Sequence, residues 1–358
     1  MEAITILSPG HLDYFDSYGL IACQLARHLT RKGIHVNCIP MGDRLSASQP
    51  FDVREAIDKP IVPSLGAINL GYPTSFTRHS YPLKQYGPKI AVTMFESTRI
   101  PDDWLPALSD MDAVIVPTKF CAEFFRSSGV KIPIHVVSLG IGEIYQYYDR
   151  PPDRNPFTFL TFLDRGIRKG GLAAIQAFVR AFGDRDDVRL FVKSRKPRVP
   201  SEILNANVRL IQTDLDEQGL YDLYCQCDAL INPNMGEGFG LIPREFAATG
   251  GIAVTTGWGG TGEDILYWGV PIQYDLVKAT WDGHKNLEGR ELGMWARPDL
   301  DHTAYLLRSI ADNREEFRRI GDHGSTWIRN RYSWESFAAG VLAVWRDIGG
   351  NYSNRETS

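Results

Sequence analysis

One stretch in the second half of the chain, residues 228–265, constrains the fold more than any other part of the sequence. Its first residues, Ala229–Asn232, form an apolar run with the length of a buried strand, and Pro233 ends it because proline cannot donate to a β-ladder. A glycine-rich turn follows, and a helical pattern then runs from about Leu241 to Gly250, a residue type common at helix C-termini. A strand, a glycine-rich turn and a helix N-terminus in this order predict an α/β protein with a site for an anion such as diphosphate.

Two glutamates flank this turn. Glu237 lies within the turn, and Glu245 lies on the helix that follows. Ionised carboxylates only accept hydrogen bonds, so they bind hydroxyl groups and not diphosphate oxygens. The backbone of Gly238–Gly240 can approach an anion closely because glycine has no side chain. The stretch therefore indicates a ligand with a phosphate portion and sugar hydroxyls on either side of it, which describes a sugar nucleotide.

The same residues carry a resemblance to a known family. The string Glu237-Gly-Phe-Gly-Leu, the second acid Glu245 and the Phe-Ala-Ala-x-Gly-Gly that follows resemble the signature of retaining GT-B glycosyltransferases, in particular glycosyltransferase family 4, the glycogen synthase-like group. The resemblance implies that Glu237 lies beside the donor sugar, that Glu245 binds the ribose hydroxyls, and that Gly238, Phe239, Gly240 and Leu241 line the donor. A Rossmann-like turn with two surface glutamates is the alternative.

A GT-B protein has two Rossmann-like domains whose parallel sheets face each other across a cleft, and a C-terminal helix that crosses back onto the N-terminal domain. The length of 358 residues agrees with two domains, because single cores rarely grow past about 250–300 residues. The Pro-rich segment 149–156 is the best linker. The predicted parts are an acceptor-binding domain at 1–150, a donor-binding domain at 151–330, a crossover helix at 331–350 and a disordered tail at 351–358.

Composition narrows the function classes. The net charge of −4 argues against a broad nucleic-acid surface, and no apolar run reaches the roughly 18 residues of a transmembrane helix. The N-terminus lacks the basic region and cleavage site of a signal peptide and is predicted to be the first buried strand. The five cysteines are scattered, so we expect reduced thiols without disulfides. These features predict a cytoplasmic protein.

The N-terminal half begins as a βαβ unit. The strand Ala3–Leu7, an amphipathic helix from Leu20 to Gly33 and the strand His35–Ile39 predict a parallel sheet. The loop that ends at Gly19 resembles the glycine loop that faces the donor phosphates in the family, which makes Gly19 a candidate donor-binding residue. An ordinary βα turn is the equal alternative.

Polar residues follow the strand Lys89–Phe95. In open α/β sheets ligands bind outside the carboxyl ends of the strands, so Glu96, Thr98 and Arg99 are candidate acceptor-binding residues. A helix-capping or ion-paired Glu96 is the alternative. Many members of the family carry a His near this strand end. This chain has none there, and the sequence does not decide whether Glu96 or His79 replaces it.

The second domain opens with a strand at Phe157–Leu163 and a basic turn. Arg165 and Lys169 lie where a strand passes into a helix, and the resemblance assigns both to the donor diphosphate and counts them with Glu237 as the catalytic residues. Arg168 is a substitute for either, and Lys193, at the end of the next strand, is a further phosphate candidate. A solvated basic loop is the alternative.

Three Asp-x-Asp strings invite a metal site, but each lies in a predicted loop or at a predicted helix start. We read Asp184/Asp186, Asp214/Asp216 and Asp299/Asp301 as surface acids and expect neither a metal nor another cofactor. Residues 275–293 show no clear period and are predicted to be an irregular insertion. A helix with Ser333 at its N-cap is expected to end near Ile348.

The sequence thus predicts a metal-independent glycosyltransferase. It would move a sugar from a nucleoside diphosphate sugar, UDP- or GDP-linked, to a hydroxyl acceptor with retention of anomeric configuration. Two alternatives stay open. One is another GT-B enzyme, an inverting transferase or a sugar-nucleotide epimerase, and the other is a non-catalytic protein that binds nucleotide sugars. A nicotinamide dehydrogenase does not fit, because Pro9-Gly10-His11 stands where a Gly-x-Gly-x-x-Gly loop would follow the first strand.

Overall fold

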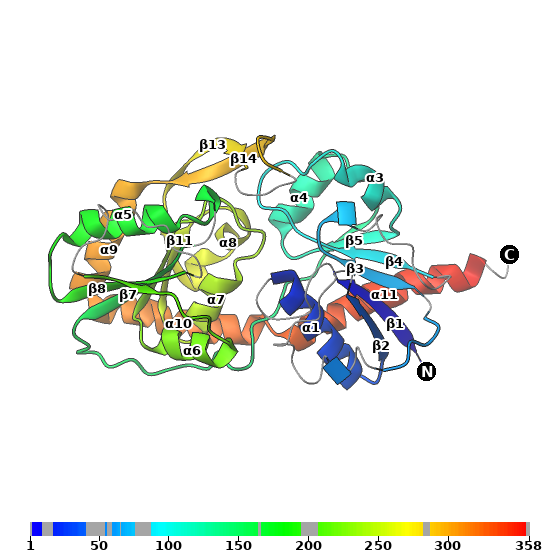
Figure 1. The fold of residues 1–358 in the computed structure, drawn as a ribbon, viewed down its shortest axis with the longest axis horizontal. Coiled ribbons are helices and arrows are strands. Elements are labelled where there is room, and N and C mark those ends of the chain that lie inside the picture. Colours follow the sequence, from blue (N-terminus) through cyan, green and yellow to red (C-terminus); the bar gives the residue numbers. More distant parts are fainter. Residues whose placement is uncertain are drawn as a thin grey trace. The chain divides into compact units, whose positions relative to one another are not determined.

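A computed structural model of the chain describes most of its residues. The described residues are 2–8, 17–40, 54–55, 59–64, 66–75, 87–163, 166–194, 207–281 and 287–355. The chain divides into two units (Figure 1). The first unit comprises Met1–Phe95, Arg99–Gly140 and Tyr332–Ser358, and the second comprises Glu96–Thr98 and Ile141–Arg331.

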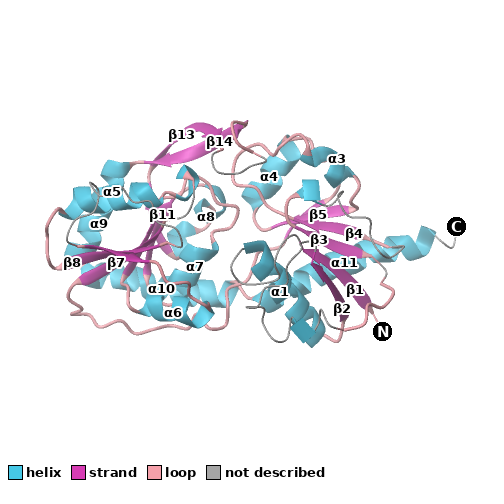
Figure 2. Cartoon of the chain, in the orientation of Figure 1, coloured by secondary structure: helices cyan, strands magenta, loops and turns pink. Residues whose placement is uncertain are grey.

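The first unit is built on a parallel six-stranded sheet with the order β2-β1-β3-β4-β5-β6. Its strands are β1 (Ala3–Ser8), β2 (His35–Pro40), β3 (Ala67–Leu70), β4 (Lys89–Val92), β5 (Ala113–Val116) and β6 (Ile134–Val136). Its helices are α1 (Ser17–Arg31), η1 (Pro73–Ser75), α3 (Trp104–Ser109), α4 (Lys119–Ser127) and α11 (Trp334–Arg355). Strand order reverses at β1, and right-handed crossovers therefore place α1 and α3–α4 on opposite faces of the sheet, as Figure 2 shows.

The second unit repeats this plan with the order β12-β11-β10-β7-β8-β9. Its strands are β7 (Phe157–Phe162), β8 (Val188–Lys193), β9 (Val208–Ile211), β10 (Ala229–Asn232), β11 (Ile252–Thr256) and β12 (Gly269–Ile272). Its helices are η2 (Ile167–Lys169), α5 (Gly171–Phe182), α6 (Glu217–Cys225), α7 (Leu241–Ala248), α8 (Gly259–Gly262), η4 (Ile265–Tyr267), α9 (Leu300–Asp312) and α10 (Arg314–Arg331). The two parallel sheets confirm the α/β prediction.

The core of the second unit lies between its sheet and the pair α5–α9. Phe159 and Phe178 are fully buried there, with ring centroids 5.8 Å apart in an edge-to-face arrangement. The strands alternate with helices and are covered on both faces, so they are apolar almost throughout, and β10 and β11 are buried over nearly their whole length. This rigid sheet positions the loops at its carboxyl edge.

The irregular insertion predicted over residues 275–293 is wrong. Strand β13 (Tyr274–Thr280) pairs antiparallel with β14 (Glu291–Pro298), so the described parts of this segment form a β-ribbon. Of the β13 side chains only Ala279 is fully buried, whereas Leu276 is 52% exposed. The sequence signal failed because a ribbon with one largely solvated strand lacks the alternation that marks a half-buried strand.

The C-terminal helix belongs to the first unit, as expected for this fold. Helix α11 packs beside α1, and Arg346 forms an ion pair with Glu2 at 2.7 Å. Ser333 caps it, because the Ser336 N–H donates to the Ser333 hydroxyl at 3.1 Å, and this prediction is confirmed. The helix runs to Arg355, beyond the end expected near Ile348. Across the described part of the chain, no helix combines the length and apolar character needed to span a membrane.

Candidate functional site

The strand, glycine-rich turn and helix that the sequence predicted are present as β10, residues 233–240 and α7, with Gly240 at the N-cap. Gly240 has a φ of 81°, a left-handed conformation that favours glycine. We call residues 236–240 the glycine loop. Phe239 is buried in this loop, and Leu241 starts α7 as a half-buried residue. The turn therefore lies at the carboxyl edge of the sheet, where α/β proteins bind ligands.

Three other segments pack against the glycine loop with backbone-to-backbone contacts that leave no room for a side chain. A Cβ on Gly236 would lie 2.0 Å from the carbonyl oxygen of Glu96, and one on Gly260 would lie 2.2 Å from that of Gly238. A Cβ on Gly170 would lie 2.0 Å from the carbonyl oxygen of Pro233, in the turn just before the loop. The segments at 96–98, 166–170 and 257–262 thus form one assembly around the loop.

Glu237 and Lys169 meet at this assembly. The Lys169 ammonium donates to the Glu237 carboxylate at 2.8 Å, and their side chains are 29% and 12% exposed. Burial would raise the pKa of Glu237, but the charges of Lys169 and Arg168 together outweigh it and hold this pKa below its ordinary value. The site therefore contains an ionised carboxylate beside an accessible ammonium group.

Glu245 lies in a different environment, on the buried face of α7. The residue is 6% exposed, and the Tyr224 hydroxyl donates to its carboxyl group at 3.3 Å. Burial raises the pKa of Glu245 to about 8, and the Glu217 carboxylate acts in the same direction, while the Tyr224 hydrogen bond partly opposes them. Glu245 is therefore largely protonated at neutral pH. Burial and the charges of Glu245 and Glu217 also raise the pKa of Tyr145.

Glu96 and Arg168 both belong to the second unit and contact each other there. One carboxylate oxygen lies 3.5 Å from the Arg168 guanidinium, and the other, Oε2, is buried with no hydrogen-bond partner among the described residues. Arg168 also donates to the Gly236 carbonyl oxygen at 2.7 Å and lies over the Trp281 ring at 5.4 Å. The ion-paired alternative for Glu96 is thus present, and Arg168 is engaged with the protein in this structure.

The remaining predicted residues lie in several places. The Thr98 hydroxyl accepts the Met294 N–H at 2.8 Å, which ties the 96–98 segment to β14. Lys193 is the last residue of β8 and is 6% exposed. Arg99 belongs to the first unit and forms an exposed ion pair with Asp102 at 3.0 Å. Arg165 and His79 lie outside the described residues.

Gly19 also belongs to the first unit, where it lies in the first turn of α1 and not in a loop, so the loop prediction for this residue is wrong. The helix starts earlier than expected, and Tyr18 in its first turn is anchored, because the Tyr18 hydroxyl accepts the Met94 N–H at 3.2 Å. Met94 is distant from Tyr18 in the sequence, so the residues around Tyr18 give no indication of this contact or of the earlier helix start.

Arg244 is the main residue near the loop that the sequence analysis missed. It is 1% exposed, and its guanidinium bonds Asp264 at 2.6 Å, the Gly260 carbonyl oxygen at 3.0 Å and the Phe239 carbonyl oxygen. The indole N–H of Trp268 donates to the same Asp264 carboxylate at 2.8 Å. The sequence did hold a signal for this role, namely an arginine on the apolar face of a short helix. Charged side chains are almost never fully buried without a partner, so such an arginine indicates a buried polar partner.

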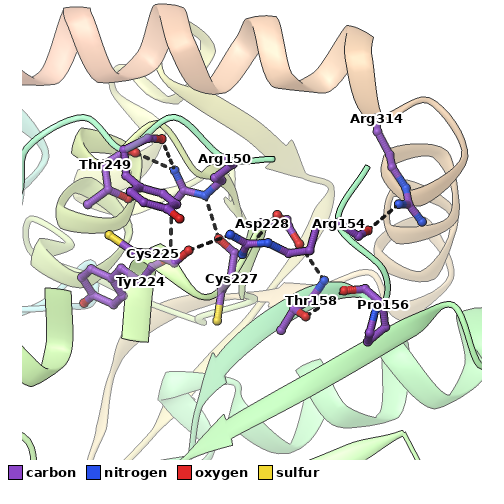
Figure 3. Close-up of polar contacts among 11 residues, drawn as sticks. Arg150, Arg154, Pro156, Thr158, Tyr224, Cys225, Cys227, Asp228, Thr249 and Arg314 are labelled. Atoms are coloured by element: carbon purple, nitrogen blue, oxygen red, sulfur yellow. Dashed lines mark hydrogen bonds and ion pairs between the residues drawn. The ribbon is translucent and has the colours of Figure 1, made fainter. Parts of the chain in front are cut away.

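A second buried arginine, Arg150, anchors the segment that the sequence assigned to the linker (Figure 3). Its guanidinium donates to the carbonyl oxygens of Tyr224, Cys227 and Thr249, at 3.1, 2.7 and 2.5 Å. These oxygens lie at the C-terminal ends of α6 and α7, where a cation is favourable. Residues 141–156 therefore pack with the second unit, and the first unit's middle segment ends at Gly140.

Among the described residues, no three His, Cys, Asp or Glu side chains gather in a way that could hold a metal ion. Asp299 of the third Asp-x-Asp string caps α9, because its carboxylate accepts the N–H groups of Asp301 and His302.

Comparison with known proteins gives a consistent result at the level of the fold. No protein-family model matches the chain. It is 24% identical over 217 residues to an MMP alpha-(1->4)-mannosyltransferase from Mycolicibacterium hassiacum, a match that covers 59% of this chain and 48% of that protein. The chain thus matches about half the length of this curated relative.

Solved structures match over nearly the whole chain. Sucrose-phosphate synthase from Thermosynechococcus elongatus superposes with a TM-score of 0.69 at 14% identity, covering 97% of this chain and 99% of that one. A trehalose-6-phosphate protein from E. coli, bound with UDP-2-fluoro glucose, superposes with a TM-score of 0.66 at 11% identity and covers 97% and 99%. With its two parallel six-stranded sheets, the chain has the GT-B fold of glycosyltransferases.

Proposed function

We propose that this protein is a retaining, metal-independent glycosyltransferase that moves a sugar from a nucleoside diphosphate sugar to a hydroxyl acceptor. The observation that carries the proposal is the pair of glutamates around the glycine loop. Glu237 is ionised beside Lys169, and Glu245, eight positions later, is buried on the helix that the loop begins. An anion-binding turn with a hydroxyl-binding carboxyl group on each side suits a sugar, a diphosphate and a ribose in a row.

Each residue has a role in this proposal. Lys169 and the N–H groups of Gly238–Gly240 bind the diphosphate, with Lys193 at the end of β8 as a further cation, and Arg165, which the sequence also assigns to the diphosphate, lies outside the described residues. Glu245 binds the ribose hydroxyls, and Glu237 orients the transferred sugar. Glu96 and Thr98 bind the acceptor. The unpartnered Oε2 of Glu96 supports this part, because a buried acceptor atom is satisfied by an incoming hydroxyl.

The chemistry follows from these roles. As the bond between the sugar and the diphosphate breaks, negative charge grows on the leaving diphosphate, and the Lys169 ammonium and the oriented N–H groups stabilise it. These fixed protein charges take the part that a metal ion plays elsewhere, so activity should survive chelation. The acceptor oxygen forms a bond to the anomeric carbon on the face from which the diphosphate leaves, and the proton of the acceptor hydroxyl passes to the leaving phosphate, so the anomeric configuration is retained.

The donor is a UDP- or GDP-sugar in this proposal. The E. coli protein of the same fold that is bound with UDP-2-fluoro glucose supports a nucleotide-sugar donor. A thermal-shift screen against UDP-, GDP-, ADP- and TDP-sugars tests it, with wild type compared to Glu245→Ala. A ligand at 100 times its dissociation constant should stabilise the folded state by about 2.7 kcal/mol.

A shift with one nucleotide series that disappears in Glu245→Ala supports the proposed site and names the base. No shift with any of the four series would refute the transferase proposal. Binding without product formation, followed by mass spectrometry with mixed sugar and lipid acceptors and with EDTA present, would instead favour a non-catalytic binding protein.

Lys169→Ala should reduce the rate of donor turnover by about 10²–10³-fold, the loss typical for one group that stabilises developing charge. The substitution also leaves the half-buried Glu237 carboxylate without its ammonium partner at 2.8 Å. Release of nucleoside diphosphate from the donor, with water or an added acceptor as nucleophile, measures the effect. Arg180→Ala is the matched control, because Arg180 is an exposed cation paired with Asp301. Equal rates for Lys169→Ala and the control would remove Lys169 from the catalytic step.

A further inference from the structure

The carbonyl oxygens of the glycine loop are held by donors of the protein. Arg168 donates to the carbonyl oxygen of Gly236 at 2.7 Å, and the Gly260 N–H donates to that of Glu237 at 2.7 Å. Arg244 donates to the carbonyl oxygen of Phe239. Three of the five carbonyl groups in residues 236–240 are thereby turned toward the protein by a cation or an N–H group.

This arrangement fixes the direction of the N–H groups in the loop. In a trans peptide the C=O of one residue and the N–H of the next point in opposite directions, and the peptide bonds of this loop are trans. The N–H of Gly240 therefore points away from Arg244, and the N–H of Gly238 points away from Gly260. Successive N–H groups that point outward form an anion-binding concavity, whereas outward carbonyl oxygens would repel a diphosphate.

Both arginines are themselves held in place by other protein groups. Arg244 forms an ion pair with Asp264 at 2.6 Å and lies between aromatic rings, with its guanidinium 4.3 Å from the Phe239 centroid and 5.0 Å from that of Trp268. Arg168 contacts Glu96 at 3.5 Å and is 12% exposed. Their charges are thus used on carbonyl and carboxylate oxygens of the protein.

We propose that Arg244 and Arg168 are positioning residues, which hold the glycine-loop peptides in the orientation that directs their N–H groups at the donor diphosphate. This inference rests on the proposed function of the site and adds two residues that do not touch the donor. Arg244 contributes more, because its planar guanidinium reaches two carbonyl oxygens and a carboxylate at once. A lysine has one nitrogen and cannot reproduce this geometry.

Arg244→Lys and Arg168→Lys test the proposal, since both keep the positive charge and remove the planar fork. Isothermal titration calorimetry would give dissociation constants for pyrophosphate, for UDP and GDP, and for uridine and guanosine. Arg244→Lys should weaken binding of pyrophosphate and of the preferred nucleoside diphosphate about tenfold or more, which corresponds to about 1.4 kcal/mol. Binding of the nucleoside alone should change less than about twofold, because the loop orientation affects only the phosphate portion. Arg168→Lys should give a smaller loss of the same kind.

Arg150→Lys is the matched control, because Arg150 is a buried arginine of the same unit that holds carbonyl oxygens away from the glycine loop. It should lower the melting temperature without changing the ratio of nucleoside to nucleoside diphosphate affinity. A folded Arg244→Lys with wild-type pyrophosphate affinity would overturn the proposal, and so would an equal loss for nucleoside and diphosphate. If Arg244→Lys does not fold, the pyrophosphate and nucleoside affinities of Arg168→Lys test the proposal instead. A wild type that binds neither pyrophosphate nor any nucleoside diphosphate would overturn the proposed function along with the inference, whereas loss confined to the lysine variants bears on the inference alone.

Discussion

Glu245→Gln is expected to make the protein more stable than wild type at pH 8 and above, even though it should weaken donor binding. Glu245 is buried on α7, and burial together with the Glu217 carboxylate raises its pKa from 4.5 to about 8. In the unfolded chain this group loses its proton near the ordinary value. Between pH 4.5 and 8 the folded protein therefore holds a proton that the unfolded chain has released.

The sign of the effect follows from this difference in bound protons. Because the folded state binds more protons in this range, the free energy of unfolding decreases as pH rises, by about 1.4 kcal/mol for each pH unit. Above pH 8 both states are ionised and the loss is complete, about 5 kcal/mol in total. Glutamine does not titrate, so the variant lacks this loss, and its advantage over wild type should grow steadily from pH 5 to pH 8.

Thermal unfolding between pH 5 and pH 9 measures this trend. A change of 1 kcal/mol shifts the melting temperature by about 2–4 °C for a unit of this size. Glu217→Gln is the first control, because it removes the neighbouring charge and should flatten part of the wild-type pH dependence.

Glu237→Gln is the second control, and its effect on stability at neutral pH should have the opposite sign. The pKa of Glu237 is lowered, so its carboxylate stabilises the folded state above about pH 4.5, and its loss should destabilise the protein at neutral pH. Parallel curves for wild type and Glu245→Gln would show that Glu245 ionises normally.

The difference between the two glutamates marks where prediction from the sequence ends. The strand at Ala229–Asn232, the glycine turn and α7 were predictable because each depends on neighbours in the chain: an apolar run, a proline, glycines and a helical period. The ionisation states of Glu237 and Glu245 were not predictable. They depend on Lys169, Arg168, Tyr224 and Glu217, which the fold brings together from separate segments.

Arg168 and the β13–β14 ribbon show the same limit. Its position in the basic turn predicted that Arg168 could replace Arg165 or Lys169 as a phosphate ligand. Its partners in the structure are instead the Gly236 carbonyl oxygen, Glu96 and the face of Trp281. Trp281 follows a strand whose exposed residues gave no periodic signal. The buried Arg244 and Arg150 were missed for a related reason, because most of the carbonyl oxygens that hold them belong to segments distant in sequence.

Arg150→Ala is expected to lower the stability of the protein strongly, although Arg150 lies in a segment whose composition is that of a linker. Its guanidinium binds three buried carbonyl oxygens and the Thr249 hydroxyl, which Figure 3 shows at the ends of α6 and α7. Removing it leaves the buried Cys227 carbonyl oxygen without this donor, which costs about 1–3 kcal/mol, and takes one of two donors from the Tyr224 and Thr249 oxygens, which keep the N–H groups of Cys227 and Tyr148. It also removes a cation from two helix C-termini. Together these effects predict a loss of about 3–5 kcal/mol, as for removal of one partner from a buried ion pair.

The melting temperature should therefore fall by roughly 10 °C in Arg150→Ala. Arg150→Lys should lie between the variant and wild type, because an ammonium group can satisfy some of the carbonyl oxygens but cannot reach both helix ends with a planar fork. Arg180→Ala removes the same charge from an exposed ion pair and should cost at most about 1 kcal/mol. If Arg150→Ala melts at the same temperature as this control, residues 149–156 are a linker, as the sequence predicted. If it melts far below the control, they are a structural part of the second unit, and the helices that carry Tyr224 and Glu245 depend on Arg150 for their position.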